Sequence, residues 1–193
     1  MIGAQPPPTN AIAGPPTRPR IVFLVVGIVL ATALGVGLFT SFGTPKPAVP
    51  TVGAAAPAFS LPLLGGGGKV GTPANGGGDG KPAVLVFFAS WCTPCQTEVP
   101  AIAAAYRHQA GSGRVAVIGV DGNDPTSAAL AFVHESGVTF PVVVDPDFQV
   151  TEGLYYFSGD PGAVFINGNG TIDHIVRGPI TRSDLLTWER RLT

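Results

Sequence analysis

The distribution of apolar residues predicts alternating buried strands and helices in the C-terminal two thirds of the chain. AVLVFFA at 83–89 is a continuous apolar run of strand length, and RVAVIGV at 114–120 repeats the pattern. Such runs are typical of strands that are covered on both faces. Between them, residues 94–109 place Val99, Ile102 and neighbouring apolar side chains at helical spacing. The pattern therefore predicts a strand, a helix and a second strand in succession.

Four further elements are expected after these, in the order helix, strand, hairpin and helix. They are a helix opened by Asp124-Pro125 and ended by Gly137, a strand at 142–144, a hairpin of 163–166 and 171–176 around Asn-Gly-Asn-Gly, and a helix opened by Thr181-x-x-Asp184. The order predicts an α/β fold with a central mixed β-sheet flanked by helices, which ends in an antiparallel strand pair.

The N-terminal part of the sequence has the pattern of a membrane anchor. Residues 21–39 carry no charge, and as a helix they would be about 28 Å long, enough to cross a bilayer. Arg18 and Arg20 precede the run, so the positive-inside rule places the N-terminus in the cytoplasm. We expect a transmembrane anchor at 21–42. A cleaved signal peptide, with the remainder secreted, is the alternative. A buried core helix is disfavoured because the run is apolar all round.

The remaining boundaries follow from proline and glycine content. Residues 1–20 are rich in proline and predict a disordered cytoplasmic tail, and residues 43–52 predict a semi-rigid linker. Residues 53–193 then form one globular domain. The glycine-rich segment 65–80 is read as a flexible insertion between an early hairpin and the first central strand. A phosphate-binding loop is disfavoured there because no lysine-serine pair follows.

Composition narrows the possible functions. Charged residues make up only 12% of the chain and the net charge is −1, which disfavours a protein that binds nucleic acid by neutralising phosphates. The chain has 2 cysteines, too few for a small domain held together by disulfides. Hydrophobic residues make up 45%, which excludes a disordered polyelectrolyte.

The two cysteines lie in the segment Trp91-Cys92-Thr93-Pro94-Cys95, after a buried strand and at the start of a helix. The positive end of a helix stabilises an anion, so the pKa of Cys92 should be low and Cys92 should attack a substrate disulfide as a thiolate. Cys95 would then resolve the mixed disulfide, and Pro94 would stiffen the turn. A purely structural disulfide is the alternative.

A zinc site is disfavoured because the chain offers no further cysteine, and its three histidines, His108, His134 and His174, are too far apart in sequence. We therefore expect no metal. The redox-active disulfide Cys92–Cys95 stands in place of a separate cofactor.

The segment VLVFFASWCTPCQTEVP resembles the thioredoxin superfamily, in particular membrane-anchored thiol–disulfide oxidoreductases of the TlpA/ResA type, which are related to the redoxin (AhpC/TSA) proteins. The similarity covers residues 53–193 and includes APAFSLPLL at 56–64, FPVVVD at 140–145, PGAVFINGNGTI at 161–172 and RGPI at 177–180. It implies a thioredoxin-like fold and an extracytoplasmic enzyme that exchanges disulfides in protein substrates. Reduction of the substrate is favoured, and the sequence leaves the direction of electron flow open. The similarity also implies a membrane thiol as electron donor and a role in cytochrome c biogenesis, with apocytochrome c thiols among the substrates.

The resemblance also implies a cis-proline that faces the disulfide, and Pro161 matches its position. The chain departs from the family pattern here, because Gly162-Ala163 follow the proline and Asp160 precedes it. An ordinary turn proline is the alternative, and Pro141 is a weaker candidate for the same role. A carboxylate of Asp160 close to Cys92 would raise the pKa of the thiol and make the pair more reducing.

Glu98 matches a family acid that lies three residues past the second cysteine. On the inner face of the helix, its carboxylate could accept the proton of Cys95 as the mixed disulfide resolves. A solvated helix glutamate is the alternative reading. Val86 occupies the strand position where thioredoxin has a buried aspartate, so the proton transfer would depend on Glu98.

Two other functions remain open at this stage. Peroxidases of the AhpC/TSA type share the fold and the early APxFSL segment, but the threonine that usually lies three residues before their reactive cysteine is Ala89 here. A non-catalytic binding module on a thioredoxin fold is the third reading, and the retention of both cysteines argues against it.

Overall fold

The computed structural model describes residues 25–28, 48–72, 80–109 and 114–192. The chain divides into two compact units, Met1–Lys46 and Pro47–Thr193. In the first unit, residues 25–28 form a helical turn with exposed side chains. The expected tail at 1–20 and most of the expected anchor at 21–42 lie outside the described residues. Within the described part of the chain, no helix has both the length and the apolar character needed to span a bilayer.

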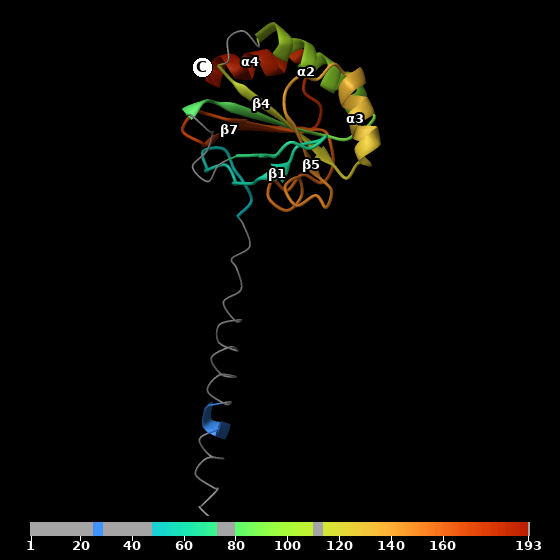
Figure 1. The fold of residues 1–193 in the computed structure, drawn as a ribbon. Helices are drawn as coiled ribbons and strands as arrows, with labels where there is room; N and C mark the ends of the chain where they lie inside the picture. Colours follow the sequence, from blue (N-terminus) through green and yellow to red (C-terminus); the bar gives the residue numbers. More distant parts are fainter. Residues whose placement is uncertain (1–24, 29–47, 73–79, 110–113, 193) are drawn as a thin grey trace, which may run out of the picture. The chain divides into compact units, whose positions relative to one another are not determined.

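The second unit is built on a five-stranded mixed sheet in the order β5-β4-β3-β6-β7 (Figure 1). The strands are β3 (Ala83–Phe88), β4 (Ala116–Gly122), β5 (Val142–Asp145), β6 (Gly162–Ile166) and β7 (Ile172–Arg177). The first three run parallel to one another, whereas β6 is antiparallel to β3 and β7 is antiparallel to β6. The predicted mixed sheet and its terminal hairpin are confirmed.

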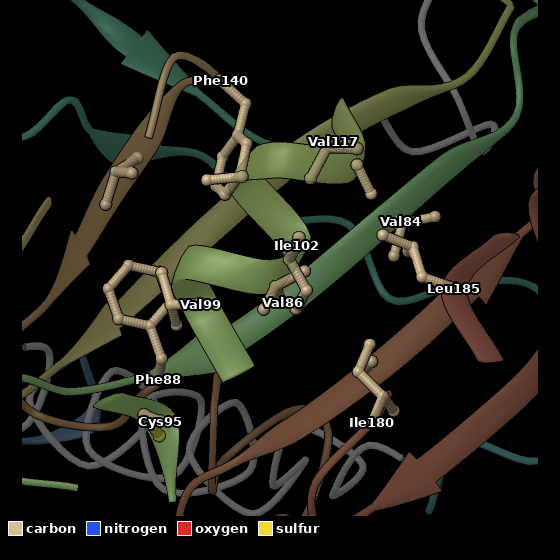
Figure 2. Packing of buried hydrophobic residues seen from close by; sticks show 14 of the residues in the cluster. Val84, Val86, Phe88, Cys95, Val99, Ile102, Val117, Phe140, Ile180 and Leu185 are labelled. Carbon is tan, nitrogen blue, oxygen red and sulfur yellow. The ribbon is translucent and has the colours of Figure 1, made fainter. Parts of the chain in front are cut away.

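Three helices cover one face of this sheet: α2 (Cys95–Gln109), α3 (Thr126–Glu135) and α4 (Arg182–Leu192) (Figure 1). Figure 2 shows the core that they enclose, in which Val84, Val86 and Phe88 of β3 face Val99 and Ile102 of α2. All six residues of β3 are buried, which explains why its sequence is apolar without alternation.

The opposite face is covered by chain segments without helices. A short hairpin of β1 (Leu61–Pro62) and β2 (Lys69–Val70) joins the edge of β5 through a bridge between Leu63 and Val143. The loop between β5 and β6 adds aromatic side chains, and the ring of Phe87 lies 5.3 Å from that of Tyr155 and 4.8 Å from that of Phe157. The prediction that segment 65–80 follows this hairpin is wrong for its first residues, because Gly65–Gly68 lie in the turn and Lys69–Val70 form the second strand. Residues 73–79 of that segment lie outside the described residues.

Both ends of α3 and the start of α4 can be compared with the sequence pattern. Gly137, with φ of +65°, lies just past the end of α3 as expected. The assignment of Asp124 as the N-cap is wrong, because Pro125 occupies that position and makes no side-chain capping bond. At α4 the predicted capping box is present: the Thr181 N–H donates to the Asp184 carboxylate (2.9 Å), and the Asp184 N–H donates to the Thr181 hydroxyl (3.2 Å).

Candidate active site

The two cysteines lie where β3 ends and α2 begins, and they form a disulfide. Cys92 and Cys95 are buried, while the Trp91 side chain is 54% exposed and Thr93 and Pro94 are exposed. The backbone N–H of Cys95 donates to the Sγ of Cys92 at 3.3 Å. The first N–H of α2 is therefore directed at the Cys92 sulfur, an arrangement that stabilises a thiolate once the disulfide is reduced.

Pro161 lies next to this loop, directly before β6. The Asp160–Pro161 peptide bond is cis, and it is the one cis bond among the described residues, so Pro141 does not share this feature. An open depression of about 550 Å³ is lined by Pro94 from the cysteine loop and by Pro161, Asp160 and Tyr156 across from it. The fold thus brings together residues that are far apart in sequence around one surface depression.

Glu98 is buried in the first turn of α2, and only 5% of its surface is exposed. Neither carboxyl oxygen has a hydrogen-bond partner among the described residues. Burial raises the pKa of Glu98 to about 7. The backbone of Ile180, near the carboxyl but outside hydrogen-bonding geometry, partly opposes the rise. The solvated alternative is wrong, and at neutral pH this carboxyl can both take up and release a proton.

Asp160 is directed toward the end of β4. A Cβ atom on Gly122 would lie 3.3 Å from its Oδ2, and neither Asp160 oxygen has a hydrogen-bond partner in the part of the chain that the structure describes. Burial is the main reason why the pKa of Asp160 rises to about 6, and the negative charges of Asp124, Asp145 and Glu152 add to the effect. Asp160 therefore carries its negative charge at pH 7 and loses it in mild acid. Its influence on Cys92 stays a prediction.

Three residues around the cysteine loop were not predicted as site residues from the sequence: Ser90, Asp121 and Asp124. The N–H of Ser90 donates to Asp124 Oδ2 at 2.5 Å, and its hydroxyl donates to Oδ1 at 2.8 Å. Asp121 is fully buried, and burial together with Asp124 raises its pKa to about 8. One signal was available: parallel strands end at the same edge of a sheet, so acids that follow the second strand lie beside the loop that follows the first.

A metal site has no support in the described part of the chain, where no group of three or more His, Cys, Asp or Glu side chains is placed to hold an ion. The reactive groups at this edge of the sheet include the two sulfurs and several buried carboxyls. Together they can move electron pairs between sulfur atoms and protons between sulfur and oxygen.

The fold and the cysteine pair define the class of protein. A thioredoxin-like sheet with a Cys-x-x-Cys pair at a helix N-terminus is the arrangement of thiol–disulfide oxidoreductases, and relatives of this chain carry that name. The chain belongs to the AhpC/TSA family, whose model matches residues 52–175.

Among curated proteins, the chain is similar to two named "Thiol-disulfide oxidoreductase ResA". It is 32% identical to that of Geobacillus kaustophilus over 82% of this chain and 87% of the relative. It is also 32% identical to that of Bacillus subtilis, over 86% of this chain and 90% of the relative. Among solved structures, StoA from Bacillus subtilis matches with a TM-score of 0.58 and 26% identity, over 74% of this chain and 98% of StoA.

Proposed function

We propose that the protein is a membrane-tethered, extracytoplasmic oxidoreductase that reduces disulfides in protein substrates through Cys92 and Cys95. The observation that carries this proposal is the position of the Cys92 sulfur, which accepts the first N–H of α2 beside an open depression lined by Pro161. The disulfide is thus placed where a nucleophilic sulfur can be formed and where another chain can approach it.

In the first step, the thiolate of Cys92 attacks one sulfur of a substrate disulfide. A bond forms between Cys92 and that sulfur, and the electron pair of the broken bond leaves on the second substrate sulfur, which takes up a proton. In the second step, Cys95 loses its proton and attacks Cys92. The Cys92–Cys95 bond forms, and the first substrate sulfur leaves with its electron pair. The substrate gains two electrons and the cysteine pair loses two.

Glu98 is the proton acceptor in the second step. Its carboxyl lies on the helix turn that follows Cys95, it is buried, and none of the described residues offers it a competing hydrogen bond. With a pKa of about 7, the carboxylate is basic enough to take the proton of the thiol and to release it again to the leaving substrate sulfur.

Substrate recognition uses the depression and the side chains around it. Trp91 is exposed beside Cys92 and offers an apolar contact to an incoming chain. Pro161 has no backbone N–H, and the preceding Asp160 lines the same depression. An extended segment of a protein substrate that lies across Pro94 and Pro161 would bring its own disulfide to Cys92.

The apolar run at 21–39 and the arginines before it support the tether and the extracytoplasmic location. In that location the oxidised pair needs a reductant, and a membrane thiol protein is the expected electron donor. We infer the reducing direction from Asp160, because a negative charge on this carboxyl close to Cys92 would disfavour the thiolate of the reduced pair.

The proposal is tested with two matched cysteine variants. Cys95→Ser keeps the attacking sulfur but cannot resolve the mixed disulfide. It should therefore accumulate a mixed disulfide with insulin or with an unfolded protein that contains a disulfide. Cys92→Ser should form none and should not reduce insulin. If Cys92→Ser retains insulin reduction, the function assigned to the pair is wrong.

A peroxidase is the second candidate, because the chain matches the AhpC/TSA family model and peroxidases of this type share the fold. Ala89, three residues before Cys92, lacks the hydroxyl expected in such a peroxidase. We therefore expect negligible consumption of hydrogen peroxide by the reduced protein. Rapid peroxide turnover that depends on Cys92 would favour the peroxidase instead.

A further inference from the structure

The chain directly before the cysteines is tied to a distant loop by one carboxylate. Ser90 is separated from Cys92 by Trp91 alone, and both its N–H and its hydroxyl donate to Asp124 in the loop between β4 and α3. A carboxylate that accepts two hydrogen bonds from one residue fixes both the position and the orientation of that residue. Asp124 thereby holds the start of the cysteine loop against the end of β4.

A second carboxyl lies behind this tie. Asp121 is at the carboxyl end of β4, opposite Phe88 in the parallel register, and is fully buried. Among the described residues neither of its oxygens has a hydrogen-bond partner, and Asp124, three residues further along the chain, acts on this carboxyl to raise its pKa. Two carboxyl groups form a hydrogen bond only when one of them carries a proton, because an ionised carboxylate is an acceptor alone.

The charges around the pair all have the same sign. Asp124 and Asp160 are the charged groups that act on Asp121, and Asp160 in turn experiences Asp124, Asp145 and Glu152. The carboxylate of Asp145 accepts hydrogen bonds from the N–H groups of Val150 and Thr151 in the loop that follows it. Burial and negative surroundings both favour a retained proton, and they account for the pKa of about 8 at Asp121.

We propose that Asp121 and Asp124 share one proton, and that Asp124 is a positioning residue that holds the cysteine loop through Ser90. With the proton present, the pair carries one negative charge and Asp121 donates to Asp124. When the proton leaves, two adjacent carboxylates repel each other and add a negative charge beneath the loop. The reactivity of Cys92 is then coupled to a protonation that is separate from that of Glu98. This rests on the proposed function, since it takes Cys92 as the attacking sulfur.

The shared proton is tested by selective ¹³C labelling of aspartate carboxyls and NMR titration of the oxidised protein. Glu98 is invisible in this experiment, and Asp160 titrates below neutral pH. One aspartate resonance should titrate above neutral pH, and it should be absent in Asp121→Asn. The control is Asp147→Asn, an exposed residue after β5, which should leave that resonance in place. If the unchanged protein shows no aspartate that titrates above neutral pH, the shared proton is refuted, whether or not any variant folds.

The coupling to the sulfur is tested by the pH profile of Cys92 alkylation in the reduced protein. The side-chain amide of the Asp121→Asn variant would donate to Asp124 at every pH. The pH profile of Cys92 alkylation should therefore lose a titration step that the parent and Asp147→Asn retain. Ser90→Ala removes one hydrogen bond without changing charge, and the Cys92 titration should shift to higher pH. Profiles of Asp121→Asn and Ser90→Ala that superimpose on that of the parent would overturn the positioning role. An unreactive Cys92 in the parent would instead refute the proposed function.

Discussion

The substitution Glu98→Gln tests the buried carboxyl most directly, through stability. Burial raises the pKa of Glu98 from its ordinary 4.5 to about 7 in the folded protein. The folded state therefore binds more protons than the unfolded state between these two pH values, and stability falls as pH rises through this window. At about 1.4 kcal/mol for each pH unit between the two values, the ionised carboxyl destabilises the fold by about 3 kcal/mol above pH 7.

Glutamine has nearly the same shape and no charge. Relative to the parent, Glu98→Gln should therefore gain stability as pH rises from about 4.5 to above 7, by about 3 kcal/mol in total. The assay is urea unfolding of the oxidised protein at several pH values, with the disulfide intact in both proteins. Comparing the two proteins at each pH cancels the contributions of Asp121 and Asp160, which are present in both.

The matched control is Glu135→Gln, because Glu135 is an exposed glutamate at the end of α3. Its substitution should leave the pH dependence of unfolding unchanged. If the difference between Glu98→Gln and the parent is the same at pH 4.5 and well above pH 7, the carboxyl does not have a raised pKa in the folded state. Its assignment as the proton acceptor for Cys95 would then lose its physical basis.

Three further outcomes are expected. Asp160→Asn should raise the reduction potential of the cysteine pair at pH 7.5 and have little effect below the pKa of about 6, where Asp160 is already neutral. The potential is measured by equilibration with glutathione, and an unchanged or lower value at pH 7.5 would refute the role of the charge. Gly119→Ala should destabilise the domain by about 1–3 kcal/mol in urea unfolding, because the added Cβ would lie 2.8 Å from the ring of Phe88 and 3.2 Å from that of Phe140. A variant as stable as the parent would contradict the close packing of these rings against Gly119. Thr181→Ala should reduce stability by about 1 kcal/mol through loss of the α4 cap, and restoration by Thr181→Ser would show that the hydroxyl is responsible.

The predictions from sequence agree most closely with the structure where they depend on residues that are neighbours in the chain. The apolar run before Trp91 and the helical spacing after Pro94 are contiguous in sequence, so they predicted β3, α2 and the location of the cysteines between them. The same holds for the capping box at Thr181. Asp124 shows the limit of local rules, because a residue with strong N-cap character is used instead to hold Ser90, a contact 34 residues away.

Neighbouring residues and backbone hydrogen bonds are enough to establish the chemistry of the site from the sequence: two sulfurs one helical turn apart at the N-terminus of a helix. The electrostatics around these sulfurs depends on the tertiary fold. Glu98 is buried by its packing near Ile180, and the approach of Asp160 to Asp121 and Asp124 depends on the order of strands in the sheet. Desolvation and charge–charge repulsion act through space, so no local pattern reports which carboxyls will be brought together away from water.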